Sequence, residues 1–396
     1  MNIAIRSAFR ADRHSSGAGL ARLELFETFS AAEPLWRRLE KDALATPYQR
    51  FEWLHYWYYH VGRIQGAEPL IVAGVDDVHA PAFILPLFCG HRYGCRIAGF
   101  GGGNHANVNM ALWRPGIATS LAGRDIAHLL GEIAAAREID LFVLLSQPPI
   151  WDGVSNPLAA LPGQRSPDDV FTASLEGVPP DFQFRLPSGM RKKVRRLEKL
   201  PGYRFAMAQS ADDVDRILTA FQPQKAARFH RQGIHNVFED AGVMDFIRAA
   251  CLDGLARGRP AIELYAIDGD GETLAVVGGV SNSQRFSVMF NSITASEAAR
   301  LSPGIILMGE IVTLCARRGI ATIDLGAGHA RYKGIFCTHA QGRVDCFLPH
   351  TLRGHALATA SKAARTVRRI AKNSPALMDT LTAMRRWATT APAWLD

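Results

Sequence analysis

The chain has 396 residues, of which 48% are hydrophobic and 21% are charged, and its formal net charge is +8. At roughly 100–200 residues per domain this length favours two domains, and the composition excludes a chain that is disordered throughout. The positive charge favours an acidic partner, such as a nucleotide cofactor, an anionic sugar, a lipid headgroup or nucleic acid, without choosing among them.

The six cysteines form no C-x-x-C pair, so we expect neither a disulfide framework nor a metal site. Residues 1–20 are polar and rich in Gly, Ser and Arg, and they lack the apolar run of a signal peptide, which predicts a disordered leader. No apolar run reaches the ~20 residues that a membrane span needs. These features predict a cytoplasmic protein.

The first domain is expected over residues 21–175. Hydrophobic periodicity predicts strands at 23–26, 70–75, 82–88, 108–113 and 141–145, and helices at 35–44, 51–61 and 117–137. The helix at 51–61 is rich in aromatic residues and places Trp53, Trp57 and His60 on one side. This stripe predicts a buried surface, with a sugar-stacking surface as the alternative.

The second domain is expected over residues 176–350. After a basic helix that begins at Ser188, strands are predicted at 203–208, 262–267, 274–280, 286–292, 320–325 and 343–348. Ser210 and Asp213 have the spacing of a capping box that starts a helix. The run Asp268-Gly-Asp-Gly271 predicts a tight turn between two antiparallel strands. Further helices are predicted at 243–258, 303–319 and 331–336. The first domain repeats the resulting order of elements, which indicates two copies of one unit.

One loop and helix start carries the strongest functional signal. Pro303 suits the first helical position, because proline has no N–H and the N–H of a residue at that position has no partner within the helix. Gly304 has no side chain, so we expect the next amides to be open to an anion. The residues expected to bind a phosphate-bearing cofactor are Arg300, Ser302, Gly304, Ile305 and Ile306.

The S-P-G helix start at 302–304 and the run D-L-G-x-G-x-x-x-Y-K at 324–333 resemble the CelD/BcsL-type acetyltransferases. That group belongs to the GNAT superfamily, is related to the FemABX peptidyltransferases and is associated with cellulose and exopolysaccharide biosynthesis. The resemblance implies an α/β (α+β) fold of tandem GNAT-like acyltransferase domains, each a mixed, mainly antiparallel sheet flanked by helices. It also implies a site for acetyl-CoA or another acyl-CoA in the second domain. The usual diphosphate loop differs, because Arg300 is one residue further from Gly304 and Ile306 replaces a small residue.

Acyl transfer from a thioester needs a base for the acceptor and an acid for the departing thiolate. His329, in a Gly-rich turn, is the candidate base, or else a surface histidine. Tyr332 is the candidate acid, or else a core residue. Asp324 would orient the base or the acceptor, or else cap the N-terminus of the next helix.

Basic residues supply the candidate substrate-binding groups. Lys333 would hold a phosphate or an acidic group, or else remain a solvated lysine. Arg191 and Lys192 belong to the basic helix that precedes the second domain, and Lys225 and Arg228 are expected in the connection between its first two helices. In this fold that connection borders the acceptor site, as the resemblance implies.

The tail at 351–396 is expected to form a basic helix. It would either pack as an ordinary C-terminal helix or lie on an anionic membrane surface, which would make the protein membrane-peripheral.

Three functions remain open. The first is an acyl-CoA-dependent N- or O-acyltransferase acting on a small-molecule or glycan acceptor, such as a carbohydrate or nucleotide-sugar precursor of a surface polysaccharide. The second is an aminoacyl transferase of the FemABX kind, for which aminoacyl-tRNA is the only nucleic acid we expect as a partner. The third is a catalytically silent protein that binds a glycan or an assembly partner.

Overall fold

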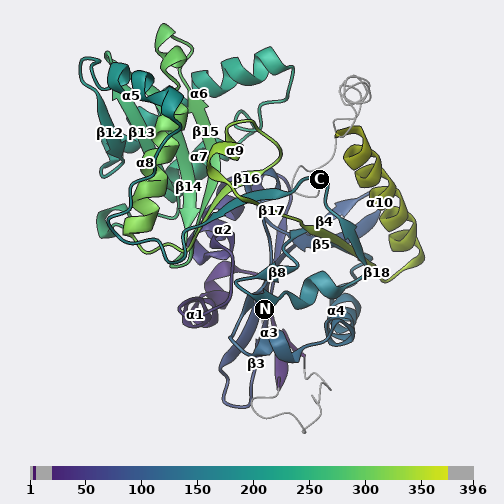
Figure 1. Ribbon diagram of the computed structural model, residues 1–396. Coiled ribbons are helices and arrows are strands. Elements are labelled where there is room, and N and C mark those ends of the chain that lie inside the picture. Colours follow the sequence, from purple (N-terminus) through teal and green to yellow (C-terminus); the bar gives the residue numbers. More distant parts are fainter. Residues whose placement is uncertain (1–2, 6–19, 373–396) are drawn as a thin grey trace. The chain divides into compact units, whose positions relative to one another are not determined.

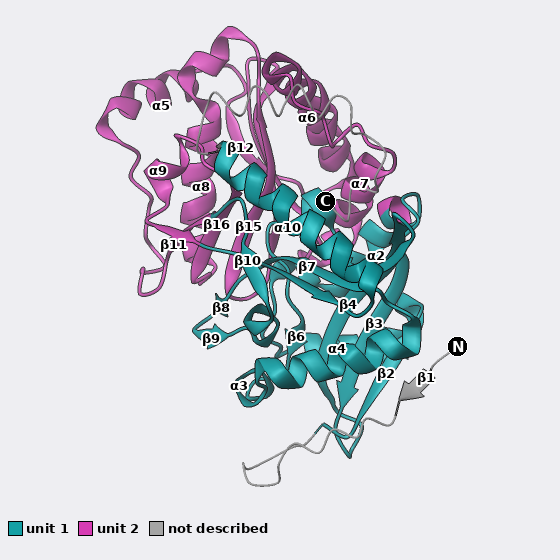
Figure 2. Ribbon diagram, turned by 90° about the vertical axis from the view of Figure 1, so that its right-hand side faces the viewer, with its two compact units in different colours: residues 1–58, 62–169, 342–396 teal, residues 59–61, 170–341 magenta. Residues whose placement is uncertain are grey.

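The computed structural model describes residues 3–5 and 20–372 (Figure 1). Two compact units divide the chain (Figure 2): unit 1 comprises residues 1–58, 62–169 and 342–396, and unit 2 comprises residues 59–61 and 170–341. Among the described residues, none of the helices has the length and apolarity that crossing a membrane requires.

Unit 1 is built on one mixed sheet. Its strands are β1 (Ile3–Ile5), β2 (Arg22–Phe26), β3 (Glu68–Val75), β4 (Pro81–Arg92), β5 (Cys95–Phe100), β6 (Leu112–Trp113), β7 (Leu141–Gln147), β10 (Gly163–Arg165) and β18 (Val344–Pro349), with β8 (Ile150–Trp151) and β9 (Val154–Ser155) as a separate hairpin. Its helices are α1 (Phe29–Glu40), α2 (Phe51–Trp57), α3 (Ile117–Ser120), α4 (Gly123–Arg137) and α10 (Leu352–Lys372).

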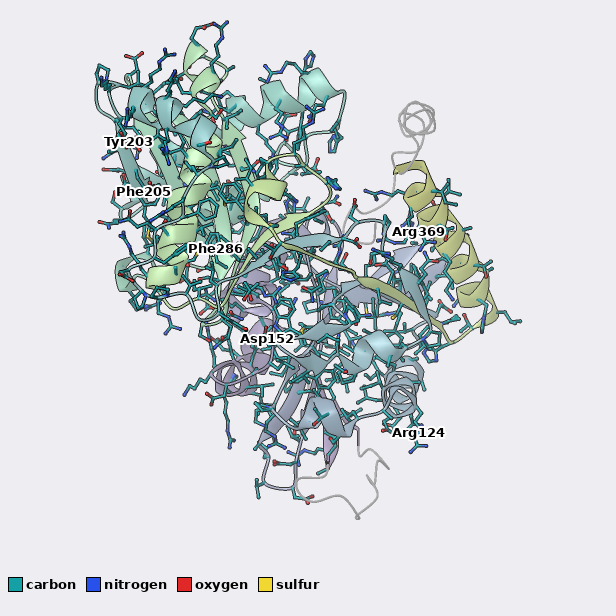
Figure 3. All side chains as sticks on the ribbon, in the orientation of Figure 1. Arg124, Asp152, Tyr203, Phe205, Phe286 and Arg369 are labelled. Carbon is teal, nitrogen blue, oxygen red and sulfur yellow. The ribbon has the colours of Figure 1, made fainter. Side chains whose placement is uncertain are left out.

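Unit 2 is built on a second mixed sheet. Its strands are β11 (Val170–Ser174), β12 (Arg204–Met207), β13 (Glu263–Gly269), β14 (Glu272–Ser281), β15 (Arg285–Ile293), β16 (Thr322–Ala327) and β17 (His339–Gln341). Its helices are α5 (Arg191–Leu197), α6 (Ala211–Gln232), α7 (Val243–Leu252), α8 (Pro303–Arg317) and α9 (Lys333–Phe336). An apolar core joins α8 to the sheet and includes Phe286. Tyr203 and Phe205 are partly buried and pack against this core (Figure 3).

The two sheets repeat one arrangement of strands and helices. In unit 2, α6 and α7 join β12 to β13, and α8 joins β15 to the parallel strand β16. In unit 1, α1 and α2 join β2 to β3, and α4 lies between β5 and the parallel strand β7. Three antiparallel strands, β12 to β14, precede the parallel pair in unit 2, and β2 to β4 correspond to them in unit 1, where β1 adds one more strand at the edge. The expected fold class and the expected repeat are therefore confirmed.

The repeats exchange their last strands. In the sheet of unit 2, the neighbour of β16 is β11, which comes earlier in the chain than the rest of that sheet. In the sheet of unit 1, the neighbour of β7 is β18, which comes after all of unit 2. The sequence analysis assigned the strand at 343–348 to the second domain, and this is wrong, because periodicity reveals a strand but not its partner. Along the chain, the boundaries between the units therefore lie between residues 169 and 170 and between residues 341 and 342. The sequence analysis had placed them between 175 and 176 and between 350 and 351.

Local signals in unit 2 act as the sequence predicts. Ser210 Oγ accepts a hydrogen bond of 3.1 Å from Asp213 N at the start of α6. Asp270 and Gly271, with φ of 54° and 76°, form the tight turn between β13 and β14 that such left-handed pairs favour. Helix α6 continues to Gln232 despite Pro223, so Lys225 and Arg228 lie on this helix and not in a connection.

Other boundaries in unit 1 differ from expectation. The third antiparallel strand is β5, whereas the predicted strand at 108–113 is reduced to the two residues of β6. Helix α1 contains Pro34 and does not begin after it, and the helix predicted at 117–137 is broken into α3 and α4. Trp53 and Trp57 are fully buried, which excludes the sugar-stacking surface.

The two ends of the chain are described only in part. Residues 3–5 of the expected leader form β1, paired with β2, so the leader is not disordered there. Its other residues, and the tail beyond Lys372, lie outside the described residues. The expected basic helix of the tail is confirmed from Leu352 to Lys372.

Candidate functional site

The parallel strands β15 and β16 separate part of the way along unit 2. They pair only through Arg285–Thr322, Phe286–Ile323 and Ser287–Asp324, although β15 continues to Ile293 and β16 to Ala327. Beyond the last pair the two strands face each other without a ladder of hydrogen bonds. An extended ligand that carries amide groups can bind to such open strand edges.

A β-bulge in β15 decides which side chains face the separated strands. The register of β15 against β14 shifts at Met289, and one additional residue reverses the alternation of side chains that follows it. Phe290 therefore faces α6, where its ring centroid lies 4.7 Å from that of Phe221. Asn291 and Ile293 point to the opposite face of the sheet, which carries α8.

Asn291 is the centre of a polar cluster. Its side-chain amide donates to Tyr332 Oη at 3.1 Å, and its main-chain oxygen accepts from Lys225 Nζ at 3.1 Å. Arg228 lies one turn after Lys225 on α6. The structure thus brings Tyr332 together with Lys225 and Arg228, which the sequence analysis selected from another segment. It also adds Asn291, which the sequence analysis missed because only the bulge turns it toward this face.

The cluster has perturbed acid–base properties. Burial, and then the positive charge of Arg228, lower the pKa of Lys225 to about 8. Its ammonium lies over the rings of Phe229 and Phe238, at 4.7 and 5.3 Å. Burial raises the pKa of Tyr332, against smaller lowering effects of Asn291 and Arg228. Because Tyr332 Oη accepts the bond from Asn291, its own proton is free to be donated elsewhere.

Asp324 and Lys333 hold the Gly-rich turn that follows β16. Asp324 is fully buried and accepts hydrogen bonds from Ser287 Oγ at 3.1 Å and Gly326 N at 2.6 Å. Burial raises its pKa. Lys333 Nζ donates to the main-chain oxygens of Gly326, Ala327 and Gly328 at 2.8, 3.0 and 2.8 Å. These contacts make both residues structural, since they shape the turn. Lys333 is buried and is not the solvated lysine of the alternative, and Asp324 caps an amide of this turn and not one of the next helix.

His329 is exposed on the same turn. Its ring makes an edge contact with Phe171 at a centroid distance of 5.1 Å. Within the part of the chain that the structure describes, it contacts neither Tyr332 nor Asn291. The expected base, His329, is therefore not in contact with the expected acid, Tyr332, among the described residues.

The N-terminus of α8 combines three unusual features. Ser302 has φ of 60° and ψ of 48°, a left-handed conformation that is strained for serine, and its side chain caps no helical amide. Its hydroxyl instead accepts a hydrogen bond of 2.8 Å from Lys193 Nζ of α5. Gly304 approaches Ile293 so closely that a Cβ atom would lie 2.7 Å from its Cγ2. Lys193, which the sequence analysis did not select, thus places a cation at the positive end of a helix dipole.

The amides at this helix start are less open than the sequence analysis expected. Ile305 N and Ile306 N both donate to Ser302 O, at 3.0 and 3.3 Å, and the Ile306 side chain is buried in the core. Among the described residues, Gly304 N–H donates to no group. The donors available to an anion at this helix start are therefore the N–H of Gly304 and the Lys193 ammonium, and not the expected run of free amides.

The remaining cations of this region are exposed. Arg300 is 81% exposed and pairs with Glu297 at 2.9 Å. Arg191 and Lys192 lie exposed on α5, the helix that packs against the segment preceding α8. This surface is therefore positively charged without fixed ligand geometry.

The equivalent helix start in unit 1 is closed to anions. Asp125 Oδ2 accepts a hydrogen bond of 2.8 Å from Ala122 N at the start of α4. This carboxylate satisfies the helix end and repels a phosphate. Of these two equivalent helix starts, only that of α8 in unit 2 is open to an anion.

Comparison with known proteins identifies the same region. Residues 186–334 match the acetyltransferase (GNAT) domain family, and no curated protein matches the chain significantly. The fold resembles FemX (11% identity, 82% of this chain and 97% of that chain, TM-score 0.57). It also resembles the C-terminal domain of a proposed lysylphosphatidylglycerol synthetase from Agrobacterium fabrum (11%, 84% and 97%, TM-score 0.51). A third such structure is a conserved protein of unknown function from Bacteroides thetaiotaomicron (12%, 81% and 98%, TM-score 0.50).

The matched region contains the whole polar cluster around Asn291 and the whole N-terminus of α8. Unit 2 therefore holds an acyltransferase domain of the GNAT kind. At these identities the likeness to solved structures concerns the fold.

Proposed function

We propose that the acyltransferase domain of unit 2 takes its acyl group from acyl-CoA and holds the diphosphate of this donor at the start of α8. The observation that carries the proposal is the pairing of Lys193 with Ser302 at 2.8 Å. A cation at the positive end of a helix is unfavourable until an anion lies between them. A diphosphate supplies that anion, and the free N–H of Gly304 adds a donor for it.

Tyr332 is the proposed acid. In acyl transfer the acceptor nitrogen or oxygen forms a bond to the thioester carbonyl carbon, the carbon–sulfur bond breaks, and the thiolate takes a proton. The raised pKa of Tyr332 keeps its proton in place at neutral pH, and Asn291 orients its oxygen. The phenol therefore gives its proton to the sulfur and regains one from solvent.

Lys225 is the proposed base and replaces His329 in this role. Because its pKa is about 8, part of its population is neutral near physiological pH and can accept the proton that the acceptor releases. The positive charge of Arg228 favours a neutral Lys225 and an anionic acceptor.

We further propose that the acceptor is a carbohydrate or nucleotide-sugar precursor of an exopolysaccharide or cellulose-type polymer. The motifs at 302–304 and 324–333, which resemble the CelD/BcsL type, support this assignment. Analogy of this kind names a class of acceptor and leaves open whether nitrogen or oxygen is acylated.

A second candidate is transfer of an aminoacyl group from aminoacyl-tRNA. The likeness of the fold to FemX supports it, and so does the basic surface of α5, which suits a polyanion. The two donors differ in how their binding responds to salt. Affinity for tRNA would fall steeply with salt concentration, because many phosphates release counterions when they are bound.

Thermal shift with acetyl-CoA, CoA and aminoacyl-tRNA separates the candidates, because a ligand of the native state raises its Tm. We expect CoA and acetyl-CoA to raise the Tm of the wild type. Gly304→Glu should abolish the shift, because its carboxylate meets the phosphates. Gly304→Ala is the matched control, since it introduces the same Cβ contact with Ile293 without the charge. A shift with aminoacyl-tRNA alone would reject CoA as the donor.

A further inference from the structure

The outward face of α10 carries an exposed apolar stripe. Leu352 is 90% exposed, Val367 51% and Ile370 54%, and Ala356 and Ala363 are exposed as well. These five residues follow one another at spacings of four, seven, four and three, so they share one face of the helix. Soluble proteins leave single apolar side chains exposed, whereas an ordered stripe indicates an interaction surface.

The opposite face fixes the orientation of α10 on unit 1. Arg365 Nε donates to the fully buried carboxylate of Asp345 at 2.6 Å. Gly354 packs so closely that a Cβ atom would lie 2.0 Å from Asp140 O. Because these contacts hold the inner face against the sheet, the apolar stripe is held outward.

Cations flank the stripe and α10 has no acidic residue. At 100° per residue, Arg353 lies about 40° beyond one edge of the stripe, whereas Lys362 and Arg369 lie about 80–100° beyond the other edge, beside the inner face. Figure 3 labels Arg369 on this helix. Basic side chains at the margin of an apolar face can extend to lipid phosphates while the face enters the bilayer.

The first turn of α10 also borders a cavity of about 590 Å³. Its lining includes the cationic or titratable groups His91, Arg96, His350 and Arg353, together with the carboxylates of Glu138 and Asp140. Asp140 is already paired with Arg353 at 2.8 Å. Arg96 likewise pairs with Glu68 at 3.1 Å. The cavity therefore offers two imidazoles and two paired guanidinium groups beside the N-terminal end of a long helix, a setting that favours a phosphate group.

We propose that α10 docks unit 1 on an anionic phospholipid bilayer, with the apolar stripe in the interface and a lipid phosphate at the cavity of its first turn. Charge complementarity selects this occupant over a second copy of the chain. Two copies of a helix without acidic residues would bring like charges together. The inference rests on unit 1 alone and is independent of the acyl donor proposed for unit 2.

Vesicle co-sedimentation of the full chain tests the proposal. We expect binding to vesicles of mixed phosphatidylglycerol and phosphatidylcholine, and little binding to phosphatidylcholine alone. Val367→Ser combined with Ile370→Ser should lower the partition coefficient about tenfold, because the apolar contact is lost. Arg369→Gln should lower it about fivefold.

Two substitutions at exposed positions of unit 1 away from α10 serve as controls. Val78→Ser changes a side chain that is 78% exposed, and Arg124→Gln changes one that is 87% exposed on α4 (Figure 3). Both should bind as the wild type does. Equal binding to neutral vesicles, or unchanged binding after the double substitution, would overturn the proposal. So would a dimer in vesicle-free solution that the same double substitution dissociates, because the stripe would then be an interface between copies.

Discussion

Replacement of Lys193 by glutamine separates a ligand-binding role from a structural one. In the wild type, Lys193 Nζ donates to Ser302 Oγ at 2.8 Å, beside the positive end of α8. Glutamine keeps an N–H donor for this bond but removes the charge. The substitution therefore tests the charge alone.

A ligand-binding role and a structural role of Lys193 predict opposite signs for the change in the stability of the free protein. Without ligand, the Lys193 charge opposes the helix dipole, so its removal should raise the free energy of unfolding by about 0.5 kcal/mol and Tm by about 1–2 °C. With ligand, a charged hydrogen bond to phosphate contributes about 1.5–3 kcal/mol. Lys193 is partly exposed, so solvent screening favours the lower value of about 1.5 kcal/mol, or about tenfold in Kd.

Isothermal titration with CoA and thermal unfolding of the free protein measure the two effects. Lys199→Gln is the matched control, because it removes the same charge from an exposed side chain close to the end of α5. It should change neither quantity appreciably. A Kd for CoA that stays within twofold of the wild type in Lys193→Gln would refute the reasoning. A lower Tm of the free variant would instead assign Lys193 to the fold.

Three further substitutions test the cluster and the turn. Tyr332→Phe should leave the Kd for CoA unchanged and lower kcat roughly 100-fold, whereas wild-type turnover would remove Tyr332 as the acid. The pKa of Lys225 is about 8 in the fold against 10.5 ordinarily, so the unfolded chain binds more protons between these values. Lys225 should therefore add up to about 3 kcal/mol of stability from pH 8 to 10.5. Burial raises the pKa of several cysteines that titrate in the same range, which lowers the stability of both proteins. Urea unfolding therefore measures the Lys225 contribution as the growth, over this pH range, of the difference in stability between the wild type and Lys225→Met. Lys333→Met should lower the free energy of unfolding by roughly 2–4 kcal/mol, because three carbonyls lose their donor; unchanged stability with weaker acceptor binding would restore its substrate-binding role.

Local signals carried most of the fold prediction. The capping box at Ser210, the turn at Asp270 and Gly271, and the proline at the start of α8 each depend on neighbours within a few residues, so the sequence alone predicts them. The exchange of β11 and β18 depends on pairing between distant segments. No pattern within either strand specifies its partner, and for this reason the domain boundaries were misplaced.

The candidate site was predictable in its residue types and less so in its geometry. Tyr332 was selected from one segment and Lys225 with Arg228 from another, and the structure joins Tyr332 to Lys225 through Asn291. Asn291 faces the cluster only because the bulge at Met289 shifts the alternation of β15, an irregularity that periodicity cannot reveal. Lys193 escaped notice for another reason. Its neighbours on α5 are equally basic, and only the contact with Ser302 distinguishes it.

The most direct test of the central claim follows the Gly304 amide itself. In protein labelled with ¹⁵N-glycine, Gly304→Ala identifies the Gly304 resonance, and Gly123→Ala identifies that of the equivalent helix start in unit 1. On titration with CoA we predict that the Gly304 signal shifts and saturates while the Gly123 signal stays in place. A Gly304 signal that remains stationary at saturating CoA would contradict the account.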